Sequence, residues 1–149
     1  MMFRRRIIFR RRRRHRRTCS LTPHYRQYRT IAETIIRHKV EQWSYVLQLE
    51  YNRVTIRNQK SRWGSCSQSK NLNFNYKLVF LPEHLLDYVV VHELCHLREL
   101  NHSLNFWSLV EGVLPEYKDH KIQLREYESR LALDPVFLEQ YRSIVDIKP

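Results

Sequence analysis

The sequence has few of the residues that cross-link a small protein or bend its backbone. It contains two glycines and three cysteines, and no two cysteines have CxxC spacing. An odd number of cysteines without such spacing excludes a disulfide framework and is typical of a reducing compartment. No apolar run approaches the roughly 18 residues that a membrane helix requires. We therefore expect a cytoplasmic protein without a membrane segment.

Acidic side chains are missing from the first 20 residues, which contain ten arginines. The rest of the chain holds 17 of the 27 basic residues against all 15 acidic ones, so most of the positive charge belongs to the N-terminus. Such a like-charge block is expected to be disordered, and residues 4–17 could contact nucleic acid through its phosphates. We predict a disordered Arg-rich tail at residues 1–20 and a single domain at residues 21–149.

The spacing of apolar residues changes along the first half of this domain. Within residues 25–48, apolar residues recur at intervals of three and four, which predicts an N-terminal helix. Residues 51–59 and 71–80 alternate between apolar and polar, and a short strand is expected near residues 63–66. We interpret these three segments as a small antiparallel sheet.

Helical patterns return in the second half of the domain. Pro82 is suited to open a helix, and Ser103 is suited to cap the start of the next one. A further helix is predicted at residues 116–131 and a short one near residues 135–145. The expected fold class is α+β, with a small sheet between helices.

The segment HELCH at residues 92–96 carries the clearest chemical signal. His92 and His96 are one helical turn apart on the same face, so both imidazoles can reach one zinc ion at about 2.0–2.1 Å. Glu93 lies beside that face, where it can take a proton from a water molecule that the metal activates. The motif predicts metal-assisted hydrolysis with Glu93 as general base.

A catalytic zinc ion normally has three protein ligands, so the motif alone is incomplete. Glu99 shares the face of His92 but lies roughly 10 Å further along the axis, and we interpret it as a solvated charge or a partner of a ligand. His102 reaches the site only if the chain turns back near Asn101, a residue that tolerates the left-handed conformation. Glu111, on the following helix, is the alternative third ligand.

Several motifs occur together in an order that resembles a known family. They are RWGSC, the YVVVHELCHL helix, the NHS segment with its following FW, and PEY. Over roughly residues 45–130 the chain resembles the YgjP-like zinc metallopeptidases, which are related to the SprT-like and Wss1-like proteases. The resemblance implies a zincin-like α+β fold with one zinc ion on His92, His96 and His102, and Glu93 as catalytic base.

The spacing HExxH-x5-H also matches the metzincin proteases, but two features count against membership. Glu99 stands where metzincins have glycine, and no methionine follows the motif, which excludes a Met-turn. The YgjP-like resemblance is therefore the more specific of the two.

These observations predict a zinc-dependent metallopeptidase that hydrolyses a protein or peptide substrate. Candidates for stabilising the oxyanion are Tyr117, Arg62 and His120, chosen for their chemistry. We expect the substrate to pair with an edge strand, and Asn71–Tyr76 is the candidate.

Two alternative functions remain open at this point. The Arg-rich tail could direct the protease to nucleic-acid-bound proteins, as the SprT-like relatives suggest. The domain could instead be a non-catalytic zinc-bearing module associated with nucleic acid. Glu93 argues against this second alternative, because a structural zinc site requires no base.

Overall fold

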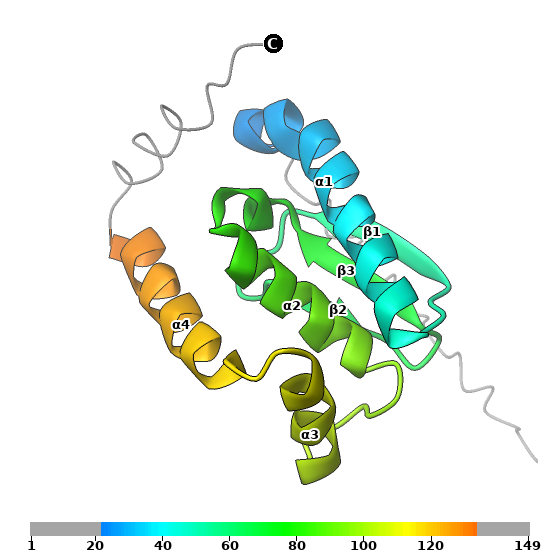
Figure 1. Ribbon diagram of the computed structural model, residues 1–149. Coiled ribbons are helices and arrows are strands. Elements are labelled where there is room, and N and C mark those ends of the chain that lie inside the picture. Colours follow the sequence, from blue (N-terminus) through cyan, green and yellow to red (C-terminus); the bar gives the residue numbers. More distant parts are fainter. Residues whose placement is uncertain (1–21, 134–149) are drawn as a thin grey trace, which may run out of the picture.

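Two helices pack side by side over one face of a small sheet in the computed structural model (Figure 1). The structure describes residues 22–133. The predicted tail, its expected contact with nucleic acid through residues 4–17, and the predicted helix near residues 135–145 lie outside this range. No helix of the described residues combines the length and apolar character needed to cross a membrane.

Helix α1 (Pro23–Leu47) forms the first of these two covering elements. The Thr22 side chain accepts a hydrogen bond from the backbone N–H of Tyr25, and Pro23 supplies a pre-set backbone angle for the first turn. The helix ends at Gln48, which adopts the left-handed conformation with φ 52°. Its buried face consists of Tyr25, Tyr28, Ala32, Ile36 and Val40.

The sheet is mixed, so the predicted antiparallel arrangement is wrong for one of its two strand pairs. Its strands are β1 (Arg53–Arg57), β2 (Gly64–Cys66) and β3 (Asn71–Asn75), in the order β1-β3-β2. β2 and β3 form an antiparallel hairpin, whereas β1 runs parallel to β3. Residues 58–63 carry the chain across the sheet before β2 begins, and alternation of apolar residues does not encode the direction of the partner strand.

Strand β3 ends earlier than its alternating pattern predicts. Residues 76–80 form a 3-10 helix, η1 (Tyr76–Phe80), instead of continuing the strand. The Asn75 side chain accepts a hydrogen bond from the backbone N–H of Lys77, and such a local bond competes with strand pairing. Tyr76, Leu78 and Phe80 nevertheless reach the core, which explains why they continue the apolar alternation.

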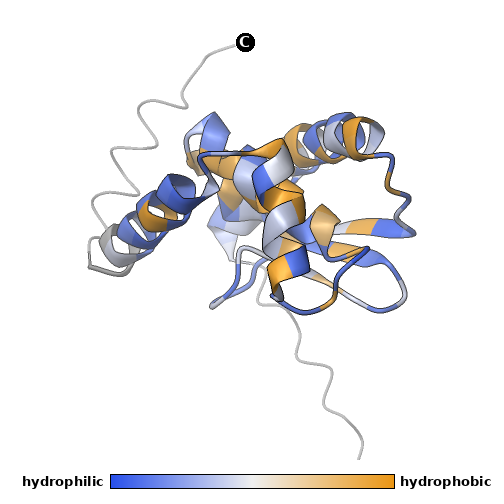
Figure 2. Cartoon of the chain, turned by 60° about the horizontal axis from the view of Figure 1, so that its bottom comes forward, coloured by the Kyte–Doolittle hydropathy of each residue, from blue (hydrophilic) through white to orange (hydrophobic). Residues whose placement is uncertain are grey.

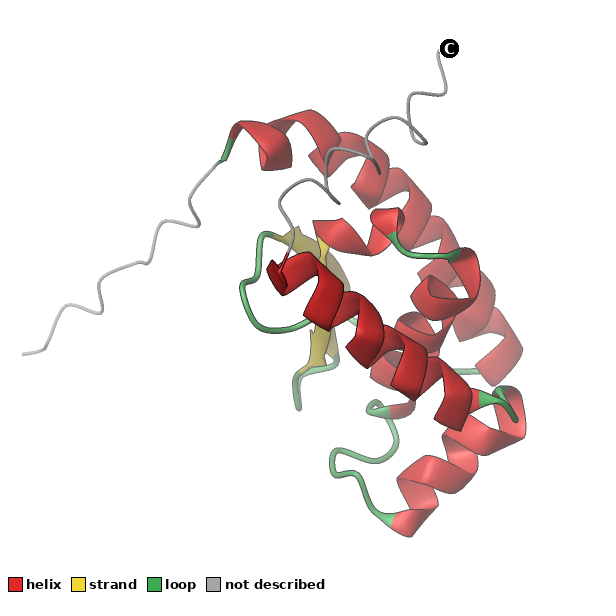
Figure 3. Ribbon diagram, turned by 90° about the vertical axis from the view of Figure 1, so that its left-hand side faces the viewer, coloured by secondary structure: helices red, strands yellow, loops and turns green. Residues whose placement is uncertain are grey.

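Helix α2 (Glu83–Cys95) passes through the middle of the molecule and is buried on most sides. Helices α3 (Leu104–Val113) and α4 (Tyr117–Leu133) pack against it, with α4 nearest the viewer in Figure 3. The apolar stretches gather where these elements face one another (Figure 2). Trp43 and Lys39 of α1 both bind the Asp87 carboxylate, at 2.8 and 3.2 Å, and so anchor α2 to α1.

Candidate metal centre

The second half of α2 places two histidines at the edge of the core. His96 is only 9% exposed and His92 is half-buried, with their ring centroids 4.9 Å apart. The spacing of four residues on one helix accounts for this proximity. The backbone carbonyl of Glu99 lies 2.9 Å from His96 Nδ1. Since a carbonyl only accepts, Nδ1 carries the proton and the lone pair of His96 is on Nε2.

A tight turn after α2 delivers the third histidine. The helix ends at Cys95, and the N–H groups of Arg98 and Glu99 both donate to the Cys95 carbonyl at 3.1 Å. Asn101 then accepts from the Ser103 N–H at 3.1 Å, and the Ser103 side chain caps α3. The expected left-handed Asn101 is wrong, because only Gln48 and Lys70 have positive φ among the described non-glycine residues. The turn therefore uses side-chain hydrogen bonds instead of a left-handed residue.

The three histidines converge on one point in space. His102 Nε2 lies 3.1 Å from His92 Nε2, and one nitrogen from each ring of His92, His96 and His102 lies within 4.8 Å of the others. Ligands about 2.0–2.1 Å from a tetrahedral zinc ion lie roughly 3.3 Å apart, so the 3.1 Å between His92 and His102 fits such an ion. Two ring nitrogens that share neither a proton nor a cation would repel each other at this distance.

Electrostatics keep these rings in the state that binds metals. Burial, together with the neighbouring His96, His102 and Lys121, lowers the pKa of His92 to about 3. The pKa of His102 is also lowered, chiefly by burial and then by His96 and Lys121. Both rings are therefore neutral at physiological pH and offer lone pairs to a cation. His92 Nδ1 is buried and has no hydrogen-bond partner among the described residues.

Aromatic side chains from α3 hold the rings in place. Phe106 is fully buried and stacks on His96 with centroids 4.4 Å apart, while Trp107 stacks on His102 at 5.6 Å. Trp107 in turn stacks on Tyr117 at 5.2 Å. Helix α3 therefore provides an apolar wall on one side of the histidine cluster.

Glu93 lies against the sheet and not toward solvent. Its side chain is 7% exposed, and its Oε2 atom has no partner among the described residues. Burial raises the pKa of this carboxyl to about 8, although the positive charge of Arg62 opposes the shift. A Cβ atom on Gly64 would lie 2.6 Å from Glu93 Cγ and 2.7 Å from Oε1. Glycine at position 64 is therefore what makes room for this carboxylate.

Glu93 and His92 both face a small cavity of about 180 Å³. Its lining residues are Trp63, Gly64, Tyr88, Val89, His92, Glu93 and Leu124. The Tyr88 ring packs edge-on to His92 at 6.0 Å, and burial raises the pKa of its hydroxyl to about 12. That hydroxyl forms no hydrogen bond with the described residues. The cavity thus contains an acceptor, a metal-binding nitrogen and a phenol that remains a donor.

Sequence reasoning missed Tyr88 and Gly64 as residues of this cavity. Tyr88 precedes His92 by four residues, the same interval that separates His92 from His96, so helical spacing contains its signal. Nothing in the local sequence shows that Gly64 contacts Glu93, because the two residues lie on different elements.

The alternative third ligand lies outside the histidine cluster. Glu111 is exposed on α3 and its carboxylate is 3.7 Å from the Lys118 ammonium. Glu99, which was interpreted as a solvated charge or a partner of a ligand, contacts His96 through its backbone carbonyl.

The three predicted oxyanion candidates lie around the centre at different depths. Tyr117 is 8% exposed and stacked on Trp107, as described above. Arg62 is exposed, yet its charge affects the pKa of Glu93. The His120 ring is 6.0 Å from that of Tyr88, and its Nδ1 is buried without a partner among the described residues. None of the three lines the cavity that Glu93 and His92 share.

Comparisons with known proteins agree with this geometry. The sequence matches the family described as YgjP-like, metallopeptidase domain, over residues 5–127. The fold is similar to the metallopeptidase zymogen of Pyrococcus abyssi abylysin, with a TM-score of 0.57 and 26% identity over 62% of this chain and 93% of that one. The zymogen of Methanocaldococcus jannaschii jannalysin is similar in fold, with a TM-score of 0.56, 24% identity, and coverage of 62% and 95%. No curated protein sequence gives a significant match.

Proposed function

This chain belongs to the YgjP-like metallopeptidase family and is a metal-dependent peptidase, and we propose that it holds one zinc ion on His92, His96 and His102. The observation that carries this proposal is the convergence of three imidazole nitrogens, two of them 3.1 Å apart. Three nitrogen ligands with a fourth position left open are typical of catalytic zinc sites. When bound, zinc lowers the pKa of water and polarises a substrate carbonyl.

Glu93 is the proposed general base. Its carboxylate takes a proton from the attacking water and later returns that proton to the leaving amine, so one side chain serves both halves of the reaction. Contact with Gly64 fixes the position of the carboxylate. Burial raises the pKa of this carboxyl to about 8 in the metal-free protein, and the positive charge of a bound zinc ion would favour the ionised carboxylate that accepts the proton.

Tyr88 is the proposed donor to the oxyanion. Its hydroxyl stays protonated at every physiological pH, because burial holds its pKa near 12. It lines the same cavity as Glu93 and has no recorded hydrogen-bond acceptor within the described part of the chain, so it is available to a substrate carbonyl oxygen. Of the four candidate donors, Tyr88 alone shares a cavity wall with Glu93.

The substrate is expected to pair with β2. The predicted strand Asn71–Tyr76 cannot serve, because β3 is the central strand and is already paired on both sides. β2 is an edge strand, it packs against α2, and it begins at the glycine that contacts Glu93. An extended peptide added to this edge would present its carbonyl groups to the cavity.

The decisive experiment combines metal analysis with a peptidase assay on the zinc-loaded protein and Glu93→Gln. We expect Glu93→Gln to retain one zinc ion and to lose about 10²–10⁴-fold in kcat, since it removes only the base. Lys118→Gln, a change on the exposed face of α4, is the control and should cleave as well as wild type. Equal cleavage by Glu93→Gln and wild type would show that Glu93 is not the base.

A further inference from the structure

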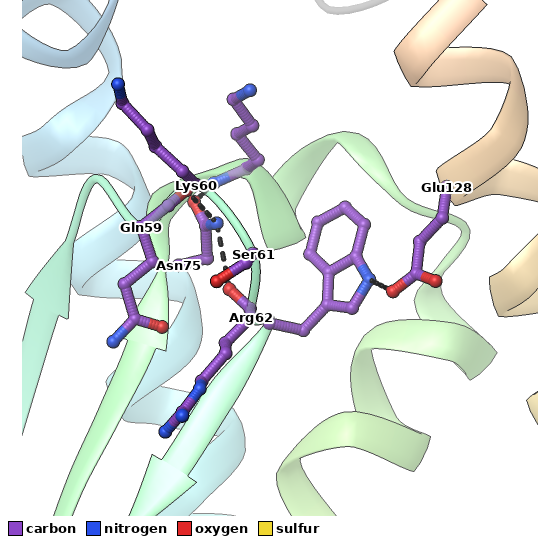
Figure 4. A pocket seen from close by; sticks show the side chains of 8 residues that line it. Gln59, Lys60, Ser61, Arg62, Asn75 and Glu128 are labelled. Carbon is purple, nitrogen blue, oxygen red and sulfur yellow. Dashed lines mark hydrogen bonds between the residues drawn. The ribbon is translucent and has the colours of Figure 1, made fainter.

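A second pocket lies beside the catalytic cavity and has a different character. It has a volume of about 330 Å³ and is shown in Figure 4. The loop between β1 and β2 forms one side, β3 and η1 form its floor, and α4 closes it. Its lining residues are Gln59, Lys60, Ser61, Arg62, Trp63, Asn75, Lys77 and Glu128. Trp63 also lines the catalytic cavity, so one indole separates the two spaces.

The charge of this pocket is positive. Lys60, Arg62 and Lys77 contribute three cations, and none of them forms a salt bridge within the described residues. Glu128 is the single acidic residue of the lining, and its carboxylate accepts a hydrogen bond from Trp63 Nε1 at 2.7 Å. Three cations against one carboxylate that already has a donor leave an excess of positive charge, which favours an anionic ligand.

The backbone of the loop is held in a fixed shape. Asn75 is 5% exposed, and its Nδ2 donates to the carbonyls of Gln59 and Arg62 at 2.9 and 3.1 Å. Its own backbone N–H donates to the Trp63 carbonyl at 2.7 Å. A buried residue of the central strand thus clamps the loop at three points. The pocket is formed before any ligand arrives, which reduces the entropy that binding costs.

Two groups of this loop suit a carboxylate in particular. The Gln59 amide and the Arg62 guanidinium extend to the same side of the loop in Figure 4, whereas the Lys60 ammonium extends to the other side. Gln59 Oε1 is buried without a partner among the described residues. A half-turn of the Gln59 amide would exchange its oxygen and its NH₂ group, so that the NH₂ group points inward. The packing allows this exchange, because the two orientations are nearly isosteric. Arginine binds carboxylates in a bidentate manner, and an amide N–H can add a further bond.

The position of the pocket relates it to the peptide that β2 would bind. Gly64, the first residue of β2, contacts Glu93, and the loop at residues 59–63 directly precedes it. Arg62 precedes Gly64 by two residues, so at about 3.3 Å per residue it lies roughly 7 Å along the strand direction from the point nearest Glu93. Resting on the function proposed above, we propose that this pocket binds a carboxylate of the peptide substrate near the cleaved bond and makes the enzyme prefer acidic peptides.

The test uses pairs of peptides that differ only by Glu or Gln at one position within three residues of the cleaved bond. For zinc-loaded wild type we expect kcat/KM to favour Glu by at least about tenfold at one of these positions. Arg62→Gln should reduce this preference to near one, and Glu128→Gln should increase it. Arg53→Gln, an exposed change on β1 outside the pocket, is the control and should leave the ratio unchanged.

The ratio separates this proposal from an effect of Arg62 on Glu93. A change in the base alone alters both peptides of a pair equally, whereas loss of the carboxylate site alters only the Glu peptide. Peptides with a free or an amidated C-terminus distinguish the two sources of the carboxylate. A preference for Glu over Gln that persists after amidation identifies the side chain, whereas a loss of kcat/KM on amidation that Arg62→Gln abolishes identifies the C-terminus. Ratios near one for every Glu/Gln pair and for every free/amidated pair in wild type overturn the proposal.

A peptide-binding assay tests the proposal if no peptide is cleaved. Trp63 lies in the wall of the pocket, so its fluorescence can report the titration of Glu93→Gln with the same peptide pairs. We expect the Glu peptide to bind at least about tenfold more tightly than the Gln peptide, with a difference that decreases as salt is added. Equal affinities would reject the pocket, whereas unequal affinities without cleavage by wild type would reject the proposed function alone.

Discussion

The two sides of the histidine cluster are built in different ways. On the core side, His92 and Glu93 belong to α2, His96 caps its C-terminal end, and Glu93 and His96 are buried in the core. On the other side, which we call the turn side, His102 is exposed and belongs to a short turn that ends at Ser103. The first side has no freedom to move without disturbing the core. The second side depends on a few local hydrogen bonds, so it is where the site can most readily be opened or tuned.

Tyr88→Phe removes one hydroxyl from the core side, and we expect it to have the largest effect on activity in this comparison. The kcat should fall about 10²–10³-fold, with zinc content and thermal stability close to those of wild type, because a single donor to the oxyanion is lost. Tyr117→Phe is the matched control and should change kcat by only a few fold. Steady-state kinetics of both zinc-loaded variants make this test. An equal loss in the two variants would contradict the assignment of Tyr88.

His102→Ala removes the only proposed ligand on the turn side. We expect zinc affinity to fall by more than about 100-fold, since the loss of a ligand should exceed the loss of a hydrogen bond to one. Glu111→Gln tests the alternative ligand and should bind zinc as wild type does, because Glu111 lies outside the cluster. Competition with a chromophoric chelator measures both affinities. Unchanged affinity of His102→Ala would exclude His102 as a ligand.

The two glycines of the chain offer a contrasting pair, because Gly64 lies beside Glu93 whereas Gly112 is exposed on α3. In Gly64→Ala the new Cβ would overlap Glu93, and displacing the carboxylate should lower kcat by about 10²-fold with the zinc still bound. Gly112→Ala places a Cβ where no atom lies within 4 Å, so activity should be retained. Paired kcat and zinc measurements decide between the outcomes. Full activity of Gly64→Ala would mean that the position of Glu93 is not restricted by this contact.

The raised pKa of Glu93 predicts a pH dependence of stability for the metal-free protein. The folded carboxyl retains its proton up to about pH 8, whereas an unfolded glutamate loses it near about pH 4.3. The folded state therefore binds more protons between these values, and its stability decreases as pH rises through this window.

Glu93→Gln removes this titration. With a chelator present, the variant should gain in Tm over wild type as pH rises from about 5 to about 8. Thermal unfolding followed by circular dichroism at both pH values measures the gain. A difference in Tm that does not change with pH would mean that burial does not shift this carboxyl.

Ser103→Ala tests the turn side with the smallest change. Its side chain accepts from the Phe106 N–H and caps α3, and losing such a cap costs about 1 kcal/mol of stability. Because the same residue ends the turn that carries His102, zinc affinity should decrease together with stability. Ser129→Ala, on the exposed face of α4, is the control and should change neither. A loss of stability with unchanged zinc affinity would mean that His102 is positioned independently of the cap.

Much of the core side could be predicted, because it depends on a single helix. The interval between His92 and His96 and the apolar positions of α2 follow from helical geometry alone. The prediction failed for the direction of β1, which needs a partner strand to define it, and for the end of β3, where Asn75 starts a 3-10 helix. On the turn side, the reversal after α2 and the Ser103 cap of α3 were predicted, but not the hydrogen bond from the Ser103 N–H to the Asn101 side chain.

The sequence alone determined that one helix carries two histidines and a carboxylate on neighbouring faces, since one helical turn is a local property of the chain. Tertiary structure decided which groups complete the site: the approach of His102, the contact of Gly64 with Glu93, and the cationic pocket behind Trp63. Each of these joins segments that different elements bring together. Their geometry follows from packing and strand pairing across the core, which no local repeat encodes.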